Sequence, residues 1–221
     1  MRNLPSLRSV ISLYAFIFVV WGFYRFLFKL PETVEELILK PIIWLLPLWW
    51  VLSNKEGMAS PAQALKSVGW TTKNFTKSIY LAIGLGVLFA AEALLVNSIK
   101  YGGSFNFLAI PLTPIMFLGA LGISLATAVS EETVFRGFIF ARLASVLGEW
   151  RGNIVTSIAW ALVHLPVTIF VFRYDAMQIL TFLFLTFLFG AASAFVYART
   201  GNVVSSVLLH VFWEWPIILF R

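Results

Sequence analysis

Three short patterns gather side chains that could do acid–base chemistry. They are Glu131-Glu132 with Arg136, Trp160 with His164, and His210 with Glu214. The two histidines are the only ones in the sequence. Glutamate and histidine are the residue types that most often transfer protons near neutral pH. The sequence therefore predicts a site in which such side chains act on a bound water molecule.

The first pattern holds two adjacent carboxylates. On a helix, Glu132 and Arg136 are four residues apart and can form an ion pair. Glu131 then lies about 100° away around the helix and is free for other work, such as general-base catalysis. The alternative is that Glu132 and Arg136 form a purely structural pair while Glu131 faces interfacial water.

In the second pattern, Trp160 and His164 share one helix face. The imidazole can orient a water molecule together with Glu131, or it can bind a metal ion. The alternative is a buried histidine that only makes a hydrogen bond to a neighbouring helix.

The third pattern, His210 and Glu214, also has a four-residue spacing. A carboxylate there would stabilise an imidazolium, and His210 could then stabilise an oxyanion. The alternative is a polar pair at the membrane interface.

The elements that carry these side chains are predicted to lie in a membrane. Of 221 residues, 60% are hydrophobic and 12% are charged, and the mean hydropathy is +0.90. A soluble domain has about a quarter of its residues charged. We therefore predict an all-α fold, a polytopic transmembrane bundle of about seven to eight helices. Charges in such helices need partners or a water-filled cavity, which favours convergence of the three patterns on one site.

Seven spans are predicted, near residues 9–28, 38–52, 78–99, 115–129, 154–172, 177–198 and 203–220. The fourth helix is expected to continue to about Val146, and Pro166 to kink the fifth. An acidic loop (32–36), a short surface helix (61–70), a Gly/Pro-rich loop (101–114) and a turn (148–153) separate the spans. Gly201 suits a helix C′ position and Asn202 an N-cap. We divide the chain into N-terminal spans with a basic loop (1–77) and a core membrane domain (78–221).

Basic residues set the predicted orientation. With a cytoplasmic N-terminus, the inner loops hold Arg2, Arg8, Lys55, Lys66, Lys73, Lys77, Arg142, Arg151 and Arg199. The outer loops hold Lys29, Lys40, Lys100, Arg173 and Arg221. This bias predicts a multi-pass protein of the plasma membrane with its N-terminus in the cytoplasm. Glu131, Glu132 and Arg136 would then lie near the cytoplasmic face, with a polar cavity opening to that leaflet.

Composition also excludes several classes. The sequence has no cysteine, which removes disulfides, thiolate nucleophiles and cysteine metal ligands. The formal charge of +6 is explained by basic residues in the loops, which set the orientation in the membrane and contact anionic lipid. We therefore expect no nucleic-acid partner. The expected partners are the bilayer and a peptide or protein substrate, and the sequence does not indicate an oligomeric state.

Together, the three patterns resemble the CAAX protease and bacteriocin-processing family, also called the Abi family. That family carries EExxxR, FxxxH and HxxxN (or Asp) on successive membrane helices, and the resemblance covers about residues 118–215. It implies a glutamate-dependent intramembrane endopeptidase without a cofactor. By carry-over, Glu131 and His164 would activate the water, and His210 with Glu214 would hold the oxyanion. Glu132, Arg136 and Trp160 would support them.

Two positions depart from the family pattern. Trp160 replaces phenylalanine, which we expect to be a mild change of packing. Glu214 replaces asparagine, and an ionised carboxylate repels an oxyanion to which an amide would donate. Glu214 is therefore expected to be protonated, to pair with His210, or to lie outside the site.

Other chemistries rank lower. A zinc site built from Glu131, His164, His210 and Glu214 is chemically reasonable, but no HExxH motif is present and the resemblance implies metal-free water activation. No GxSxG motif or Ser–Lys pairing indicates a serine protease.

The leading hypothesis is an endopeptidase that cleaves a membrane-anchored, in some cases lipidated, peptide or protein tail. The alternative is a non-catalytic immunity or scaffold protein of the same fold, with the oxyanion site disabled by Glu214. A weaker third option is a small transporter with Glu92 and Glu131 as proton sites, although no inverted repeat supports it.

Overall fold

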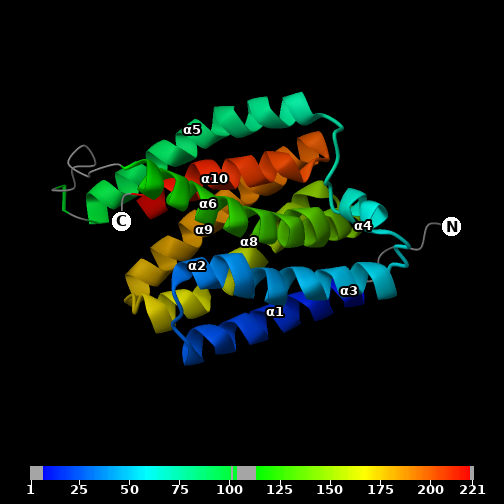
Figure 1. Cartoon of the computed structure of the whole chain (residues 1–221), viewed down its shortest axis with the longest axis horizontal. Coiled ribbons are helices and arrows are strands. Elements are labelled where there is room, and N and C mark those ends of the chain that lie inside the picture. The colour runs from blue at the N-terminus through cyan, green and yellow to red at the C-terminus, as the bar shows by residue number, and fades with distance from the viewer. Residues whose placement is uncertain (1–6, 101, 104–112, 220–221) are drawn as a thin grey trace.

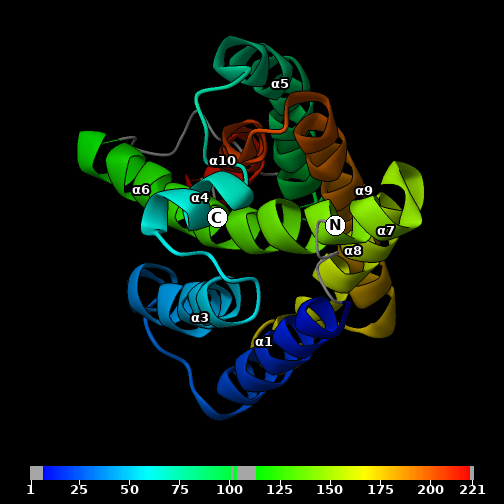
Figure 2. The same cartoon turned by 90° about the vertical axis from the view of Figure 1, so that its right-hand side faces the viewer.

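The computed structural model describes residues 7–100, 102–103 and 113–219, and every regular element in these ranges is a helix. The long helices run side by side along the longest axis of the molecule (Figure 1). Seen along that axis, α1 and α3 lie on one side of the bundle and α5 on the other, with α6, α8, α9 and α10 between them (Figure 2). Arg2, Arg221 and most of the predicted Gly/Pro-rich loop lie outside the described residues.

The helices are α1 (Leu7–Leu27), α2 (Glu32–Val34), η1 (Glu35–Leu39), η2 (Pro41–Leu45), α3 (Leu46–Asn54), α4 (Pro61–Ser67), α5 (Phe75–Lys100), α6 (Pro114–Glu132), η4 (Thr133–Phe140), α7 (Ala141–Leu147), α8 (Glu149–Val163), η5 (Val167–Val171), α9 (Ala176–Thr200) and α10 (Val203–Leu219). The η segments have π-helical hydrogen bonding.

Six helical stretches among the described residues are long and apolar enough to cross a membrane. They are Leu7–Leu27, Glu32–Asn54, Phe75–Ile99, Pro114–Leu147, Glu149–Val171 and Ala176–Thr200. Val203–Leu219 is a shorter apolar helix in the place of the seventh predicted span. The predicted class, an all-α polytopic membrane bundle, is confirmed, and the chain is an integral membrane protein.

The second span begins earlier than the sequence predicts. The acidic segment assigned to a loop is helical from Glu32 onward, and Glu35 and Glu36 are buried. Glu35 forms an ion pair with Arg25 and accepts a hydrogen bond from Tyr24. Because each buried carboxylate has a cationic partner, the helix can carry both into the bundle.

The fourth and fifth spans position the site. As predicted, the fourth helix continues past Val129, and Pro114–Leu147 forms one stretch of 34 residues. Its backbone changes to π-helical hydrogen bonding directly after Glu132, a widening that often occurs at functional sites. The predicted turn over 148–153 is wrong, since α8 already begins at Glu149. Near Pro166, where the sequence predicts a kink, the α-helical pattern is interrupted at His164.

One end of the bundle is closed by α4 and the residues that follow it. The backbone oxygen of Val68 lies 2.3 Å from where a Cβ on Gly137 would be, so only glycine permits this approach. Gly69 accepts a backbone hydrogen bond from Val203, and Asn202 donates to the carbonyl oxygens of Thr71 and Lys73. We refer to this end as the α4 end, and to the one that holds residues 28–31 and 172–175 as the far end (Figure 1).

The turn before α10 forms as predicted. Gly201 has a left-handed backbone with φ of 63°, and Asn202 Oδ1 accepts a hydrogen bond from the backbone N–H of Val204. The short helix α4 lies within the predicted surface helix, and Ser60 caps its N-terminus.

Candidate active site

One cavity of about 200 Å³ brings the predicted site residues together. Glu131, His164, His210 and Glu214 all line it, from α6, α8 and α10. Lys40, which follows η1 in the second span, also lines it. The three sequence patterns therefore converge, joined by a residue from the N-terminal part of the chain.

Glu131 is held by two donors. Lys40 Nζ lies 2.8 Å from its Oε1, and the indole N–H of Trp160 donates to its Oε2 at 2.8 Å. Only 3% of the surface of Glu131 is exposed. Two donors on opposite oxygens fix the carboxylate in its ionised form and in one orientation. We call Glu131, Lys40, Trp160 and His164 the Glu131 cluster.

His164 faces Glu131 with a defined ring orientation. Its Nδ1 lies 2.7 Å from the carbonyl oxygen of Trp160, which can only accept, so Nδ1 carries the hydrogen. In the neutral ring, Nε2 then has a free lone pair, 3.8 Å from Oε2 of Glu131. The interruption of α8 at His164 thus presents a basic nitrogen to the cavity.

Glu132, the next residue, is enclosed on every side. It is fully buried and accepts from Arg136 at 3.1 Å, Ser193 at 2.6 Å and His210 Nδ1 at 2.8 Å. The Arg136 guanidinium lies 4.5 Å over the ring of Trp160. The predicted Glu132–Arg136 pair is present, but its link to His210 is not visible in the spacing. We call Glu132, Arg136, Ser193 and His210 the Glu132 cluster.

Glu214 lies at the opposite edge of His210. Its Oε2 is 3.9 Å from His210 Nε2 and has no hydrogen-bond partner among the described residues. Of the three expectations for Glu214, a position outside the site is excluded because the side chain lines the cavity. It lies next to the atom of His210 that would face a reacting group.

Lys40 is the residue that the sequence patterns missed. The sequence assigns it to an outer loop, whereas it is 3% exposed and ion-paired with Glu131 and Glu36. Glu36 also accepts from Thr127 on α6 at 2.8 Å. The four-residue spacing of Glu36 and Lys40 is the one signal that could have placed both on a helix.

The structure corrects the expectation for Trp160, and the lower-ranked zinc alternative can be compared with it. Trp160 does more than pack, because its indole N–H contacts Glu131, and phenylalanine has no such donor. The four candidate zinc ligands do not form a metal-binding group: none of three or more His, Cys, Asp or Glu occurs among the described residues. Lys40 binds Oε1 of Glu131, and Glu132 binds Nδ1 of His210, so these two atoms already have partners that a metal ion would have to replace.

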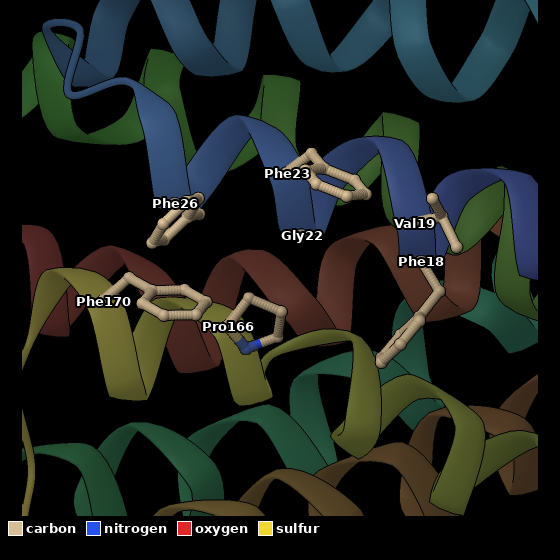
Figure 3. A pocket seen from close by; sticks show the side chains of 7 residues that line it. All are labelled: Phe18, Val19, Gly22, Phe23, Phe26, Pro166 and Phe170. Carbon is tan, nitrogen blue, oxygen red and sulfur yellow. The ribbon is translucent and has the colours of Figure 1, made fainter.

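An apolar hollow lies beside the site, on the face where α1 meets η5 (Figure 3). Its lining has no charged side chain: Phe18, Val19, Gly22, Phe23, Phe26, Pro166 and Phe170. Gly22 lines it without a side chain, and a Cβ there would be in van der Waals contact with Pro166 at 3.4 Å. The η5 segment separates the hollow from the cavity, which Val167 lines.

A comparison with known protein families finds a match over the part of the chain that carries the three patterns. Residues 112–216 match the family model described as "Type II CAAX prenyl endopeptidase Rce1-like". No curated protein and no solved structure matches the chain. The match contains all three patterns and confirms the resemblance to the CAAX protease family. Lys40 and the rest of the second span lie outside it.

Proposed function

We propose that this protein is a membrane endopeptidase that cleaves a membrane-anchored peptide or protein tail with a water molecule activated by Glu131 and His164. The observation that carries the proposal is the facing pair of Oε2 on Glu131 and Nε2 on His164, 3.8 Å apart in the cavity. A water molecule about 2.8 Å from each atom fits this separation. The family match supports endopeptidase activity.

The chemistry begins with attack by the water oxygen on the carbonyl carbon of the scissile peptide bond. The water proton passes to the Glu131–His164 pair, and the carbonyl oxygen becomes an oxyanion. The same proton then goes to the leaving amide nitrogen as the C–N bond breaks. Water is thereby divided between a new carboxylate and a new amine.

His210 is suited to stabilise the oxyanion when both of its nitrogens carry hydrogen. Its Nδ1 lies 2.8 Å from Oε1 of Glu132, and its Nε2 faces the cavity side, where an N–H would donate to the oxyanion. Lys40 and Trp160 act through Glu131, because their hydrogen bonds fix the orientation of its carboxylate. Oε2, which accepts from Trp160, is also the oxygen that faces His164 Nε2.

The apolar hollow suits the lipid chain of an anchored substrate. It lies between α1 and the segment of Pro166 and Phe170 (Figure 3), and both of these segments also contribute residues to the cavity lining. A chain bound there would bring the attached peptide near His164. The excess of basic residues at the α4 end favours an N-terminus in the cytoplasm, and we propose the plasma membrane as the location.

The deciding experiment compares membranes of the native host that carry wild-type protein or Glu131→Gln at matched expression. Mass spectrometry searches for protein termini that occur only with the wild type. A small set of termini that disappears with Glu131→Gln would support a protease and identify its substrate. Retained cleavage by Glu131→Gln would refute the proposed mechanism.

A non-catalytic immunity or scaffold role remains the second candidate, favoured by one observation. Glu214 lies 3.9 Å from His210 Nε2, where its charge would oppose an oxyanion. Identical termini in wild type and Glu131→Gln would support that role.

A further inference from the structure

The two ends of the bundle differ in charge. Among the described residues, the exposed basic side chains at the α4 end are Arg8, Lys55, Lys66, Lys73, Lys77, Arg151 and Arg199. At the far end they are Lys29 and Arg173. Lys40, counted with the outer loops from sequence, is buried in the site and does not belong to either surface. Arg142, counted with the inner loops from sequence, is buried as well, and the remaining excess of exposed basic side chains favours the α4 end as the cytoplasmic one.

The cavity opens toward the far end. Its floor is formed by Glu131 and His210, which are 3% and 2% exposed. Its rim includes Phe172, which is 46% exposed and follows η5. Along α10, the residues before His210 are mostly buried, whereas residues 211–218 are mostly half-buried. The lining side chains are therefore less buried toward the far end than at Glu131 and His210, both along α10 and at Phe172 after η5.

The α4 end, in contrast, is closed beneath the site. All residues from 130 to 140 on α6 and η4 are buried. Trp70, just after α4, donates to Thr133 at 3.1 Å, and Val68 lies against Gly137. Arg142 adds an ion pair to Glu56 and a hydrogen bond to the backbone oxygen of Ser67. These contacts join the polar segment after the second span to the helix that carries Glu131.

We propose that the active-site cavity opens to the non-cytoplasmic side of the membrane and is sealed from the cytoplasm by α4. The side to which the cavity opens does not depend on the proposed function. Only the consequence for the substrate class rests on that function. The substrate is then a membrane-anchored peptide or protein whose scissile segment lies outside the cytoplasm, such as an exported peptide. It also means that the expected cytoplasmic-facing cavity and the expected cytoplasmic N-terminus cannot both hold.

The natural absence of cysteine makes the test direct, because single cysteines can be introduced without prior substitutions. Arg173→Cys reports the far end, and Lys66→Cys on α4 is the matched control, since both side chains are exposed. Phe172→Cys reports the cavity rim itself. A membrane-impermeant maleimide is applied to intact cells, and detergent-solubilised protein gives the full labelling of each variant.

We expect Arg173→Cys and Phe172→Cys to be labelled in intact cells, and Lys66→Cys to be labelled only after solubilisation. Labelling of Lys66→Cys in intact cells would overturn the inference, as would protection of Arg173→Cys or Phe172→Cys. Labelling needs no catalysis, so this result is independent of whether Glu131→Gln changes the protein termini. Where such termini are found, we expect them in non-cytoplasmic segments, and termini confined to cytoplasmic segments would contradict the inference.

Discussion

Glu131 and Glu132 are neighbours in the chain, yet the two carboxylates have opposite surroundings. Glu131 lines the cavity and accepts hydrogen bonds from Lys40 and Trp160. Its Oε2 also faces Nε2 of His164 at 3.8 Å. Glu132 is fully buried and accepts from three side chains within its own cluster. A carboxylate with an open side can take part in proton transfer, whereas one with every side occupied holds its neighbours in place. The comparison predicts that one carboxylate serves catalysis and the other serves the fold.

The largest effect is expected for Glu131→Gln. The amide cannot take a proton from water, so peptide cleavage should fall by about 10²- to 10⁴-fold. Thermal unfolding in detergent should change little, because Lys40 keeps Glu36 as a partner. If Glu131→Gln were inactive because it unfolds, Glu131 would be a structural residue like Glu132, and the proposed contrast between the two carboxylates would be wrong.

Glu132→Gln tests the other half of the comparison. It leaves the Arg136 guanidinium buried without its counter-charge, which should cost about 3–5 kcal/mol of unfolding free energy. The matched control is Glu149→Gln, which breaks the exposed pair with Arg199 and should cost less than about 1 kcal/mol. Equal unfolding temperatures for the two variants would contradict a structural role for Glu132.

Lys40→Met sharpens the comparison within the Glu131 cluster. Without the ammonium, Glu131 loses its lysine partner and Glu36 keeps only the longer pair with Arg25, and we expect kcat to fall by roughly 10- to 100-fold, as for loss of a charged hydrogen bond. Lys40→Arg should restore part of the rate, because the cation remains. Lys55→Met, at an exposed lysine, is the control and should retain full activity. Failure of Lys40→Arg to exceed Lys40→Met would argue against an electrostatic role.

Trp160→Phe should have a smaller effect. The ring packing is kept, and only the indole donor to Glu131 is lost, so cleavage should fall by about tenfold. Kinetics with a purified substrate would separate this from a binding defect, since we expect kcat rather than KM to change. An unchanged kcat would return Trp160 to the simple packing role that the family's phenylalanine suggests.

Glu214→Asn should have the smallest effect and the opposite sign. If Glu214 only accompanies His210, the amide supplies a donor near Nε2, and activity should be retained or raised. The same cleavage assay measures it. An inactive Glu214→Asn would show that the carboxylate itself is needed in the cavity.

Much of the fold and part of the site could be predicted from the sequence. Apolar segment lengths located the spans, and four-residue spacing located the Glu132–Arg136 pair, because both depend on local geometry. Spacing could have placed Glu36 and Lys40 on one helix, but not Lys40 in the site, since its bond to Glu131 joins residues 91 positions apart. Three closely spaced glutamates also resemble a polar loop until their partners are known. Burial of Glu35 and Glu36 depends on Arg25 and Lys40, which only the tertiary structure brings near.

The glycine at position 137 also matters to the cell that holds this protein. It lets the backbone of Val68 close the α4 end against the helix that carries Glu131. A channel of water and charged groups through the whole bilayer would conduct protons and discharge the membrane potential, which is worth about 2.3 kcal/mol per charge at 100 mV. With one end closed, water can reach the middle of the membrane from a single side. The approach of Val68 to Gly137, together with the contacts of Trp70 with Thr133 and of Arg142 with Glu56, then preserves the insulating layer that an energised membrane requires.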